Sequence, residues 1–302
     1  MAAINKKKSV LGRLALLLTT IIWGTSFVIL KNTLGSVSTF YTMAFRFTIG
    51  TALLILLCIP SLKDLNKQYI KSGILMGCML FGGYTFQTYG LVYTTPGKNA
   101  FLTSTYCVIV PFLYWAIYKR KPNKYNLIAA FMSIIGIGLV SLNESFSVGL
   151  GEGLTIICGL FYALHIIFTS NAVKDGNPML ITMLTLAVCC ILSWIFALIV
   201  DPFPKEIPAD ALLGILYLAI MCTGLTFILQ VFGQKYTPPS QVSIILGLES
   251  VFGTLVSIFF YNEVLTLRLA VGFTVIFLSV LISETKLDFL KGHKKAEVKN
   301  NL

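Results

Sequence analysis

Apolar runs of about twenty residues recur from one end of this chain to the other, and they constrain its fold more than any other feature. One such run, coiled as an α-helix, crosses a hydrocarbon core roughly 30 Å thick. A transmembrane β-barrel would instead show short segments in which apolar and polar residues alternate. Hydrophobic residues make up 56% of the 302 residues and charged residues only 12%, whereas soluble domains carry about 25% charged residues. The chain is therefore predicted to be an all-α polytopic membrane protein.

Ten helices are predicted from these runs, separated by short connections that are rich in turn-forming residues. Their ranges are 11–30, 37–59, 70–92, 98–118, 123–142, 149–170, 178–200, 210–233, 238–260 and 265–284. No connection is long enough to hold a soluble catalytic domain. The opening "KKKSVLGRLALLLTTIIWG" imitates a signal peptide, but no small-x-small cleavage site follows it. A retained first helix is therefore expected.

Basic side chains are distributed unevenly over the two sides of such a bundle. With the N-terminus inside, 18 Lys and Arg residues fall on the inner side and 4 on the outer side, and Arg46 lies within a helix. Cytoplasmic segments carry the excess of Lys and Arg, so both termini are predicted to be cytoplasmic. The net charge of +11 is spread over short connections and two tails, which does not favour a nucleic-acid partner. The basic tail 286–302 is expected to lie in the cytoplasm near anionic membrane lipid.

The two halves of the chain resemble each other. "GILMGCMLFGGYTF" at 73–86 aligns with "GILYLAIMCTGLTF" at 214–227, and the segments that follow, "TTPGKNAFL" and "KYTPPSQVSII", align in the same order. The pattern predicts two five-helix units, 1–142 and 149–285. Because five is odd, the second unit must enter the membrane from the opposite side. Such inverted repeats suit alternating access around a midplane site.

Several stretches together resemble a known family. They are "WGTSFVI" in the first predicted helix, Arg46 in the second, "TTPGKNAFLTSTYCVIVP" across the third connection and fourth helix, and "LESVF" and "YNEVLTLRLAVGF" late in the chain. Over nearly its whole length the chain is similar to the drug/metabolite transporter superfamily with two EamA-type domains. The resemblance implies a ten-helix carrier of the prokaryotic plasma or inner membrane that exports amino acids or related metabolites. This chain has Glu249-Ser250 where the family often has Glu-Pro, whereas Pro111 is present in the corresponding fourth helix.

Glu249 is the acidic residue that most needs an explanation. It lies about eleven residues, or ~16 Å, from each end of its predicted span, and the other Asp and Glu residues fall in connections, tails or helix ends. A carboxylate at that depth costs ~2.5–3.5 kcal/mol on insertion scales, so it must face a cavity, pair with a cation or stay protonated. A stripe of small residues that includes Ser250 and Thr254 predicts a helix–helix seam beside it. Two roles are open: a neutral acid bonded to neighbouring backbone, or a partner for a substrate ammonium or a coupling proton.

Two basic side chains lie deep in the predicted spans. The guanidinium of Arg46 stays charged, and its partner is either a substrate carboxylate or Glu249, which would make a structural bridge. One acid and one guanidinium match the two charges of a zwitterion, which favours an amino acid or a similar metabolite as the substrate. His165, aligned with Ser26 of the first helix, is either a hydrogen-bonded packing residue or a proton relay.

Other polar and aromatic side chains within the spans are candidates for the same site. Trp23 and Tyr162 occupy equivalent repeat positions, so inverted symmetry would bring both to a shared cavity. Gln87 and Gln230 lie in the corresponding third and eighth helices, where each either lines the cavity or clamps a neighbouring helix. The remaining aromatic candidates for the substrate site are Tyr84, Tyr106 and Phe227.

The sequence favours a secondary carrier over other classes of membrane protein. All seven cysteines lie in apolar runs without CxxC spacing, and no G-x-x-x-x-G-K-[ST] loop occurs, so no metal, cofactor or ATP-driven pump is indicated. Coupling to protons through Glu249 and uncoupled facilitation are both open. A channel or a non-transporting membrane sensor is the alternative function, and an intramembrane enzyme would need clustered acids, histidines or an activated nucleophile. The carrier is expected to act as a monomer or a homodimer.

Overall fold

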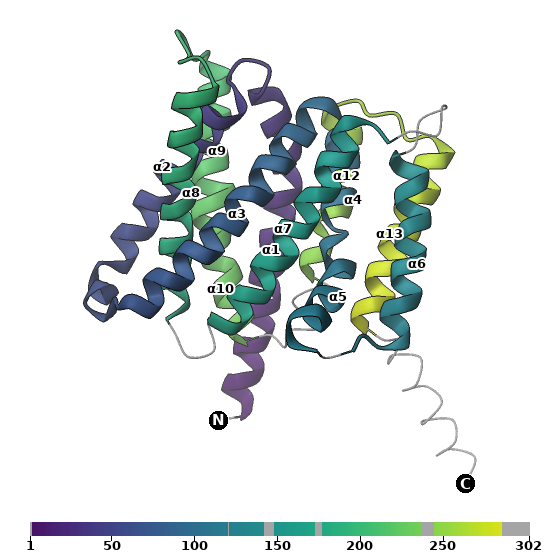
Figure 1. Ribbon diagram of the computed structural model, residues 1–302, viewed down its shortest axis with the longest axis horizontal. Helices are drawn as coiled ribbons and strands as arrows, with labels where there is room; N and C mark the ends of the chain where they lie inside the picture. Colours follow the sequence, from purple (N-terminus) through teal and green to yellow (C-terminus); the bar gives the residue numbers. More distant parts are fainter. Residues whose placement is uncertain (1, 120, 142–147, 173–176, 237–244, 286–302) are drawn as a thin grey trace.

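The computed structural model describes residues 2–119, 121–141, 148–172, 177–236 and 245–285. Over these residues the chain is helical and contains no β-strand, which confirms the all-α class (Figure 1). The elements are α1 Ala2–Thr33, α2 Thr39–Cys58, η1 Ile59–Asp64, α3 Lys67–Tyr93, α4 Pro96–Thr103, α5 Tyr106–Tyr118, α6 Lys124–Ser141, α7 Leu150–Ala172, α8 Pro178–Val200, α9 Ala209–Ala219, η2 Ile220–Leu225, α10 Thr226–Tyr236, α12 Glu249–Phe260 and α13 Leu267–Thr285.

Six helical segments among the described residues are long and apolar enough to cross a membrane, and the chain is a multi-pass membrane protein. They are Lys8–Thr33, Thr39–Asp64, Pro96–Tyr118, Leu150–Thr169, Pro178–Val200 and Ala209–Gly233. Three further apolar helices are shorter, with 10–17 described residues. α3 has 27 residues, but its five glycines and its polar side chains lower its hydropathy. Ten spans therefore stay a prediction.

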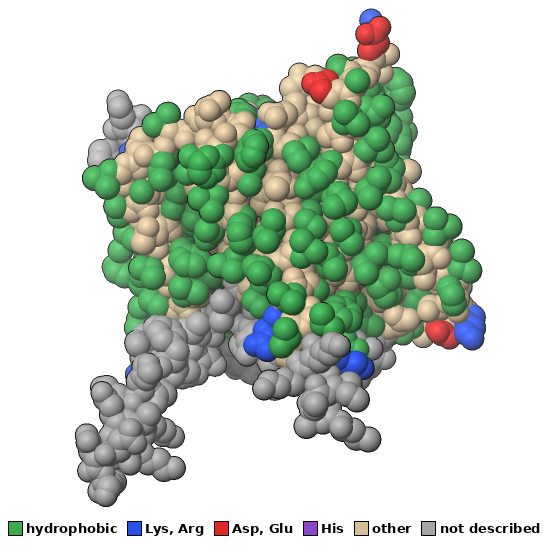
Figure 2. Space-filling model, turned by 180° about the vertical axis from the view of Figure 1, so that it is seen from behind, with side chains coloured by type: hydrophobic (Ala, Val, Ile, Leu, Met, Phe, Trp, Pro, Cys, Tyr) green, Lys and Arg blue, Asp and Glu red, His purple; other side chains and the backbone are tan. Residues whose placement is uncertain are grey.

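The outer surface of the bundle is apolar. In Figure 2, hydrophobic side chains cover the flank of the molecule, while the charged side chains in view lie at its two ends. Phe259 is 73% exposed and Leu267 is 82% exposed, which in water would leave large apolar patches uncovered. Lipid chains cover such a surface at no cost, because they are as apolar as the side chains.

α3 crosses the bundle obliquely and packs closely against α7 and α8 (Figure 1). Its glycines make this approach possible. A Cβ at Gly77 would lie 2.5 Å from the Cβ of Val188 in α8, and one at Gly82 would lie 2.5 Å from the Phe161 ring in α7. Real side chains do not approach so closely, so α3 meets both neighbours through its bare backbone. The small residues thus serve tight helix packing.

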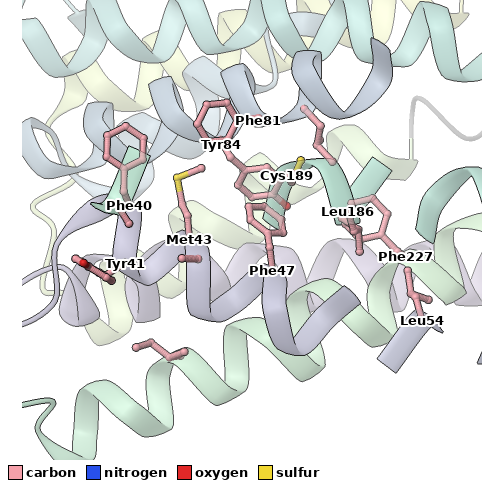
Figure 3. Close-up of a cluster of buried hydrophobic side chains, with 14 of the residues drawn as sticks. Phe40, Tyr41, Met43, Phe47, Leu54, Phe81, Tyr84, Leu186, Cys189 and Phe227 are labelled. Carbon is pink, nitrogen blue, oxygen red and sulfur yellow. The ribbon is translucent and has the colours of Figure 1, made fainter. Parts of the chain in front are cut away.

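An apolar cluster fills the space between α2, α3 and α8. Figure 3 shows Phe47, Tyr84, Leu186 and Cys189 pointing toward one another from these helices, with Phe227 of α10 nearby. The rings of Phe47 and Tyr84 meet edge to face with their centroids 5.0 Å apart. This packing holds one side of the site described below.

Two of the predicted spans are irregular in the structure. The span predicted at 98–118 is not one helix, because α4 ends at Thr103 and α5 begins at Tyr106. Pro111 lies inside α5 and is not the cause of the break. At the break, the Thr105 hydroxyl donates to the Leu102 carbonyl at 2.6 Å. The span predicted at 210–233 contains η2, a π-helical segment.

The ninth predicted span is only partly described, because residues 238–244 lie outside the described residues. Its described part turns at Leu248, and α12 begins at Glu249. The Ser250 hydroxyl donates to the Gly247 carbonyl at 2.8 Å, which is the same i to i−3 bond that Thr105 makes at the other break. Glu249 therefore lies in the first turn of a helix, where the macrodipole favours a negative charge.

Candidate functional site

Arg46 lies within α2 and is only 4% exposed. Its Nε donates to Thr223 Oγ1 at 2.7 Å, and its Nη2 donates to the Cys222 carbonyl at 3.2 Å and to the Tyr84 hydroxyl at 3.3 Å. The guanidinium also lies 4.7 Å from the centroid of the Tyr84 ring, in range of a cation–π interaction. All these partners are neutral, and no described residue accepts a hydrogen bond from Nη1. The guanidinium thus keeps the capacity to bind an anion.

The π-helical segment η2 supplies two of the partners of Arg46. Its wider turn displaces backbone carbonyls from the regular ladder and makes them available to side chains. The Cys222 carbonyl accepts from Arg46 and also from Trp23 Nε1 at 3.1 Å. Trp23 Nε1 lies 3.0 Å from Thr226 Oγ1 as well. The apolar pattern of the sequence predicts a regular helix here and does not single out Cys222 and Thr223, since backbone irregularity leaves no signal in hydropathy.

Trp23 is also the centre of a smaller group of predicted site residues. Its ring packs edge to face against Phe227, with centroids 6.1 Å apart. Ser26 makes only a local bond, from its hydroxyl to the Trp23 carbonyl at 2.6 Å. The structure therefore brings Trp23 and Phe227 together, while Ser26 bonds to its own helix.

Tyr162 and Gln87 connect three helices. The Tyr162 hydroxyl donates to Gln87 Oε1 at 2.9 Å, and Gln87 Nε2 donates to Thr103 Oγ1 at 3.2 Å. Tyr162 reaches this position because Gly83 has no side chain: a Cβ there would lie 2.5 Å from Tyr162 Cε1. Gln87 therefore links α3 to α7 and α4.

Asn99 of α4 belongs to the same network, and the sequence analysis missed it. It is fully buried, and its Nδ2 donates to the Gln87 carbonyl at 3.2 Å and to Thr155 Oγ1 at 2.7 Å. Its Oδ1 has no partner among the described residues. Its amide side chain lies within the predicted span 98–118. Asn99 could therefore have been found from the sequence by the criterion that identified Gln87, a polar side chain inside an apolar span.

Glu249 is 6% exposed, and among the described residues none donates a hydrogen bond to its carboxylate. The ion pair between Lys98 and Glu152 is the one found in the described part of the chain, so Glu249 and Arg46 do not form the structural bridge that the sequence allowed. The small residues beside it are buried as predicted, with Ser250 at 2% and Thr254 at 7% exposure. Both deep charges thus lack a counter-ion from the described chain.

Two tyrosines lie near both of these charges. Tyr84 and Tyr162 are each within electrostatic range of both Arg46 and Glu249. Their rings meet edge to face with centroids 5.8 Å apart, and Tyr106 packs against Tyr162 at 6.5 Å. The structure therefore brings five of the predicted residues into one neighbourhood: a guanidinium, a carboxyl group and three tyrosine rings.

Two of the predicted residues lie apart from this neighbourhood. His165 is half-buried, and its Nε2 lies 3.4 Å from Thr169 Oγ1, one turn along its own helix. The Thr169 hydroxyl donates in turn to Met76 Sδ at 3.2 Å. Gln230 is half-buried, and among the described residues its side chain makes no hydrogen bond. The contacts of His165 are those of a packing residue, and no described contact connects it to Glu249.

The described residues contain no group of three or more His, Cys, Asp and Glu side chains that could hold a metal ion. All seven cysteines lie in the described residues, where none forms a disulfide bond and five are buried. The neighbourhood of Arg46 and Glu249 can therefore bind through charge, hydrogen bonds and aromatic rings.

Comparison with known proteins identifies the class to which this fold and site belong. The EamA-like transporter family matches residues 10–142 and, a second time, residues 149–285. The chain belongs to this family. It is 33% identical over 275 residues to an uncharacterized transporter of Archaeoglobus fulgidus, covering 91% of this chain and 86% of that protein. It is also 22% identical to the uncharacterized transporter YoaV of Bacillus subtilis, over 86% of this chain and 91% of that protein.

A solved crystal structure has the same fold. The two superpose with a TM-score of 0.64 over 92% of this chain and 97% of the other, at 16% sequence identity. At that identity the likeness concerns the fold alone. The chain is thus a multi-pass membrane protein of the EamA-like transporter family.

Proposed function

We propose that this protein is a secondary transporter that moves a small zwitterionic metabolite, such as an amino acid, by alternating access. Its two halves, residues 1–142 and 149–285, would be inverted five-helix repeats in a prokaryotic plasma or inner membrane, with both termini cytoplasmic. Export is the direction that the family resemblance favours. Coupling to protons would run through Glu249.

The directions of the helices support the inverted arrangement. α1 and α7, the first helices of the two halves, run in opposite directions along the bundle, and so do α6 and α13 (Figure 1). The two halves also exchange equivalent hydrogen bonds. Trp23 of α1 donates to Thr226 of α10, while Tyr162 of α7 donates to Gln87 of α3. Each first helix thus bonds to the third predicted helix of the other half, as a pseudo-two-fold axis in the membrane plane would require.

Irregular helices in both halves support a binding site between them. The breaks after Thr103 and at Leu248 expose backbone inside the bundle, and so does the π-helical segment η2. Such backbone is tolerated at membrane depth where it is buried in protein or lines a cavity. In transporters, discontinuous helices of this kind form the substrate site.

The observation that carries the proposal is the pair of deep charges without counter-ions. Arg46 is bonded only to neutral acceptors, and Glu249 accepts no hydrogen bond from the described residues. Nη1 of Arg46, which has no acceptor among the described residues, can donate a charge-assisted hydrogen bond to a carboxylate. A substrate with one carboxylate and one ammonium group would compensate both charges at once. Tyr84 and Tyr162 would hold the rest of the molecule between them.

The test is counterflow in proteoliposomes that contain the purified full-length protein. Saturable exchange of a labelled amino acid against an unlabelled pool requires alternating access, which a channel or a sensor would not show. A thermal-shift screen of amino acids selects the substrate first, because a bound ligand raises the melting temperature by mass action. Binding that raises the melting temperature without any exchange would favour a sensor, and fast flux without saturation would favour a channel.

Proton coupling is tested separately with Glu249→Gln, which keeps the shape of the side chain and cannot carry a proton. The variant should exchange substrate but lose uptake or efflux driven by a pH gradient. The control is Glu206→Gln, in the exposed connection between α8 and α9. Proton-driven transport that persists in Glu249→Gln would remove the coupling role and leave an uncoupled facilitator.

A further inference from the structure

A second polar cluster lies at the end of the bundle where α3 ends and α4 begins, shown at the top of Figure 1. It is centred on the segment Thr94–Lys98, which spans the junction of these two helices. We call it the end cluster. Of its acidic members, Glu263 lies in a predicted connection and Glu152 at the start of the predicted span 149–170, where acidic residues are common and drew no functional prediction.

Glu263 is the first anchor of the end cluster. Its carboxylate accepts hydrogen bonds from the hydroxyls of Thr95 and Ser257 and from the backbone N–H of Gly97, the last at 2.9 Å. Asn262 precedes it with a φ of 55°, a left-handed conformation that Asn adopts more readily than most residues. This turn directs Glu263 back over the end of α12 and onto the first turn of α4. Glu263 thus acts as an N-cap supplied by a distant part of the chain.

Glu152 is the second anchor, in the first turn of α7. It is 7% exposed, and its Oε1 accepts from Thr94 Oγ1 at 2.9 Å and from Lys98 Nζ at 3.1 Å. Glu152 therefore binds both ends of the segment Thr94–Lys98, and Glu263 binds Thr95 and Gly97 within it. Charge-assisted bonds of this kind are roughly twice as strong as neutral ones.

Lys31, in the last turn of α1, is the third anchor. Its Nζ donates to the carbonyls of Leu91, Val92 and Thr94, at 2.6, 2.9 and 2.9 Å. These carbonyls have no partner within α3, because the helix ends here. A cation from a neighbouring helix satisfies them and is attracted by the negative end of the helix dipole.

We propose that Glu263 and Glu152 are gate residues of the transport cycle, and that the end cluster is this gate in its closed state. The proposal rests on the proposed transport function. The cluster fastens the start of α4 to α1, to α7 and to the connection after α12. α4 also carries Asn99 and Thr103, which bond to Gln87 in the site. Release of the start of α4 would therefore open a path from this end of the bundle to the substrate site.

The gate can be tested with a thiol that the chain already carries. Cys158 of α7 is fully buried, its Sγ lies 3.8 Å from Thr103 Oγ1, and it is about 12 Å along the helix from Leu150. A variant that keeps Cys158 and replaces the other cysteines is placed in sealed membrane vesicles. A maleimide that cannot cross the membrane is added on the side opposite the N-terminus. The measured quantity is the rate of labelling, which requires no substrate.

Glu263→Gln should increase the rate of labelling from that side about tenfold, because one charged acceptor and at least one of three hydrogen bonds are lost. Glu206→Gln is the matched control, an exposed glutamate in a connection at the same end, and its rate should equal that of the parent. If Glu263→Gln does not fold, as judged by gel filtration and thermal melting, Ser257→Ala takes its place and removes one donor only. An increase smaller than tenfold but above the control is then expected.

Equal labelling rates in the Glu263 variant, the Ser257 variant and the parent would overturn the gate, and so would faster labelling only from the side of the N-terminus. Either result would leave the proposed transport function intact, because counterflow is measured independently. Conversely, faster labelling of the Glu263 variant in a protein that shows no exchange in counterflow would contradict the proposed transport function. It would leave the opening of the end cluster in place.

Discussion

The centre of the bundle and its α3–α4 end each hold charged side chains, but the chain supplies partners for these charges to different extents. In the end cluster, Glu152, Glu263 and Lys31 bind three or two partners each, and the donors or acceptors come from the chain itself. In the centre, Arg46 has only neutral partners, and Glu249 has none among the described residues. A saturated charge fastens helices together, whereas an unsaturated one keeps its capacity for a ligand. Under the proposed function, the contrast would separate gating groups from binding groups within one protein.

The largest effect is expected from Arg46→Lys. An ammonium keeps the charge but lacks the planar fork with which Arg46 holds Thr223, Cys222 and Tyr84 and leaves Nη1 for a carboxylate. Substrate exchange in counterflow should fall by about 100-fold, as for the loss of a buried hydrogen bond to a charged group. Lys205→Arg, in the exposed connection between α8 and α9, is the control for the opposite exchange and should transport normally. Unimpaired exchange in Arg46→Lys would show that the deep guanidinium does not bind substrate.

The stability of the protein should respond in opposite ways to the loss of a carboxylate in the end cluster and the loss of one in the centre of the bundle. Glu152→Gln removes the charge that Lys98 and Thr94 bind, and should lower the free energy of unfolding by ~2 kcal/mol. Glu249→Gln removes a buried charge without a counter-ion, so it should leave the stability unchanged or raise it. Thermal melts of the detergent-purified variants measure both. A strongly destabilised Glu249→Gln would mean that the carboxylate has a structural partner after all.

A smaller effect is expected from Gly83→Ala. The added Cβ would lie 2.5 Å from Tyr162 Cε1, so the ring must move and its bond to Gln87 must lengthen. Substrate affinity, measured by the thermal shift, should fall about fivefold, which corresponds to ~1 kcal/mol. Gly153→Ala in the same bundle is the control, because its Cβ would meet no atom nearer than 4.0 Å. Equal affinities in the two variants would remove Tyr162 from the site.

The smallest effect is expected from Ser26→Ala. Its hydroxyl bonds only to the Trp23 carbonyl in its own helix, so transport should change by less than about twofold, as for a neutral local hydrogen bond. Trp23→Phe, in contrast, removes the indole N–H that both Cys222 and Thr226 accept, and should reduce exchange several-fold more. Similar losses of substrate exchange in the two variants would indicate that Ser26 also contributes to substrate binding.

The isolated deep charges were visible in the sequence because a charge inside an apolar run is costly and therefore conspicuous. Arg46 and Glu249 were found in this way, and the structure brings both near Tyr84 and Tyr162. Glu152 and Glu263 were not found, because they lie at helix ends and in connections, where acidic residues are common. Cys222 was not found either, because it contributes its backbone carbonyl, and every residue has one.

The sequence by itself determined the all-helical membrane fold, since runs of apolar residues can satisfy their backbone hydrogen bonds in lipid only as helices. The tertiary structure decided which charges are compensated. Whether Glu249 meets Arg46, or Glu263 meets Gly97, depends on where helices break and which of them pack together, and such long-range pairings leave no mark in the local sequence. Compensation at the end of the bundle and its absence in the centre could therefore be read only from the folded chain.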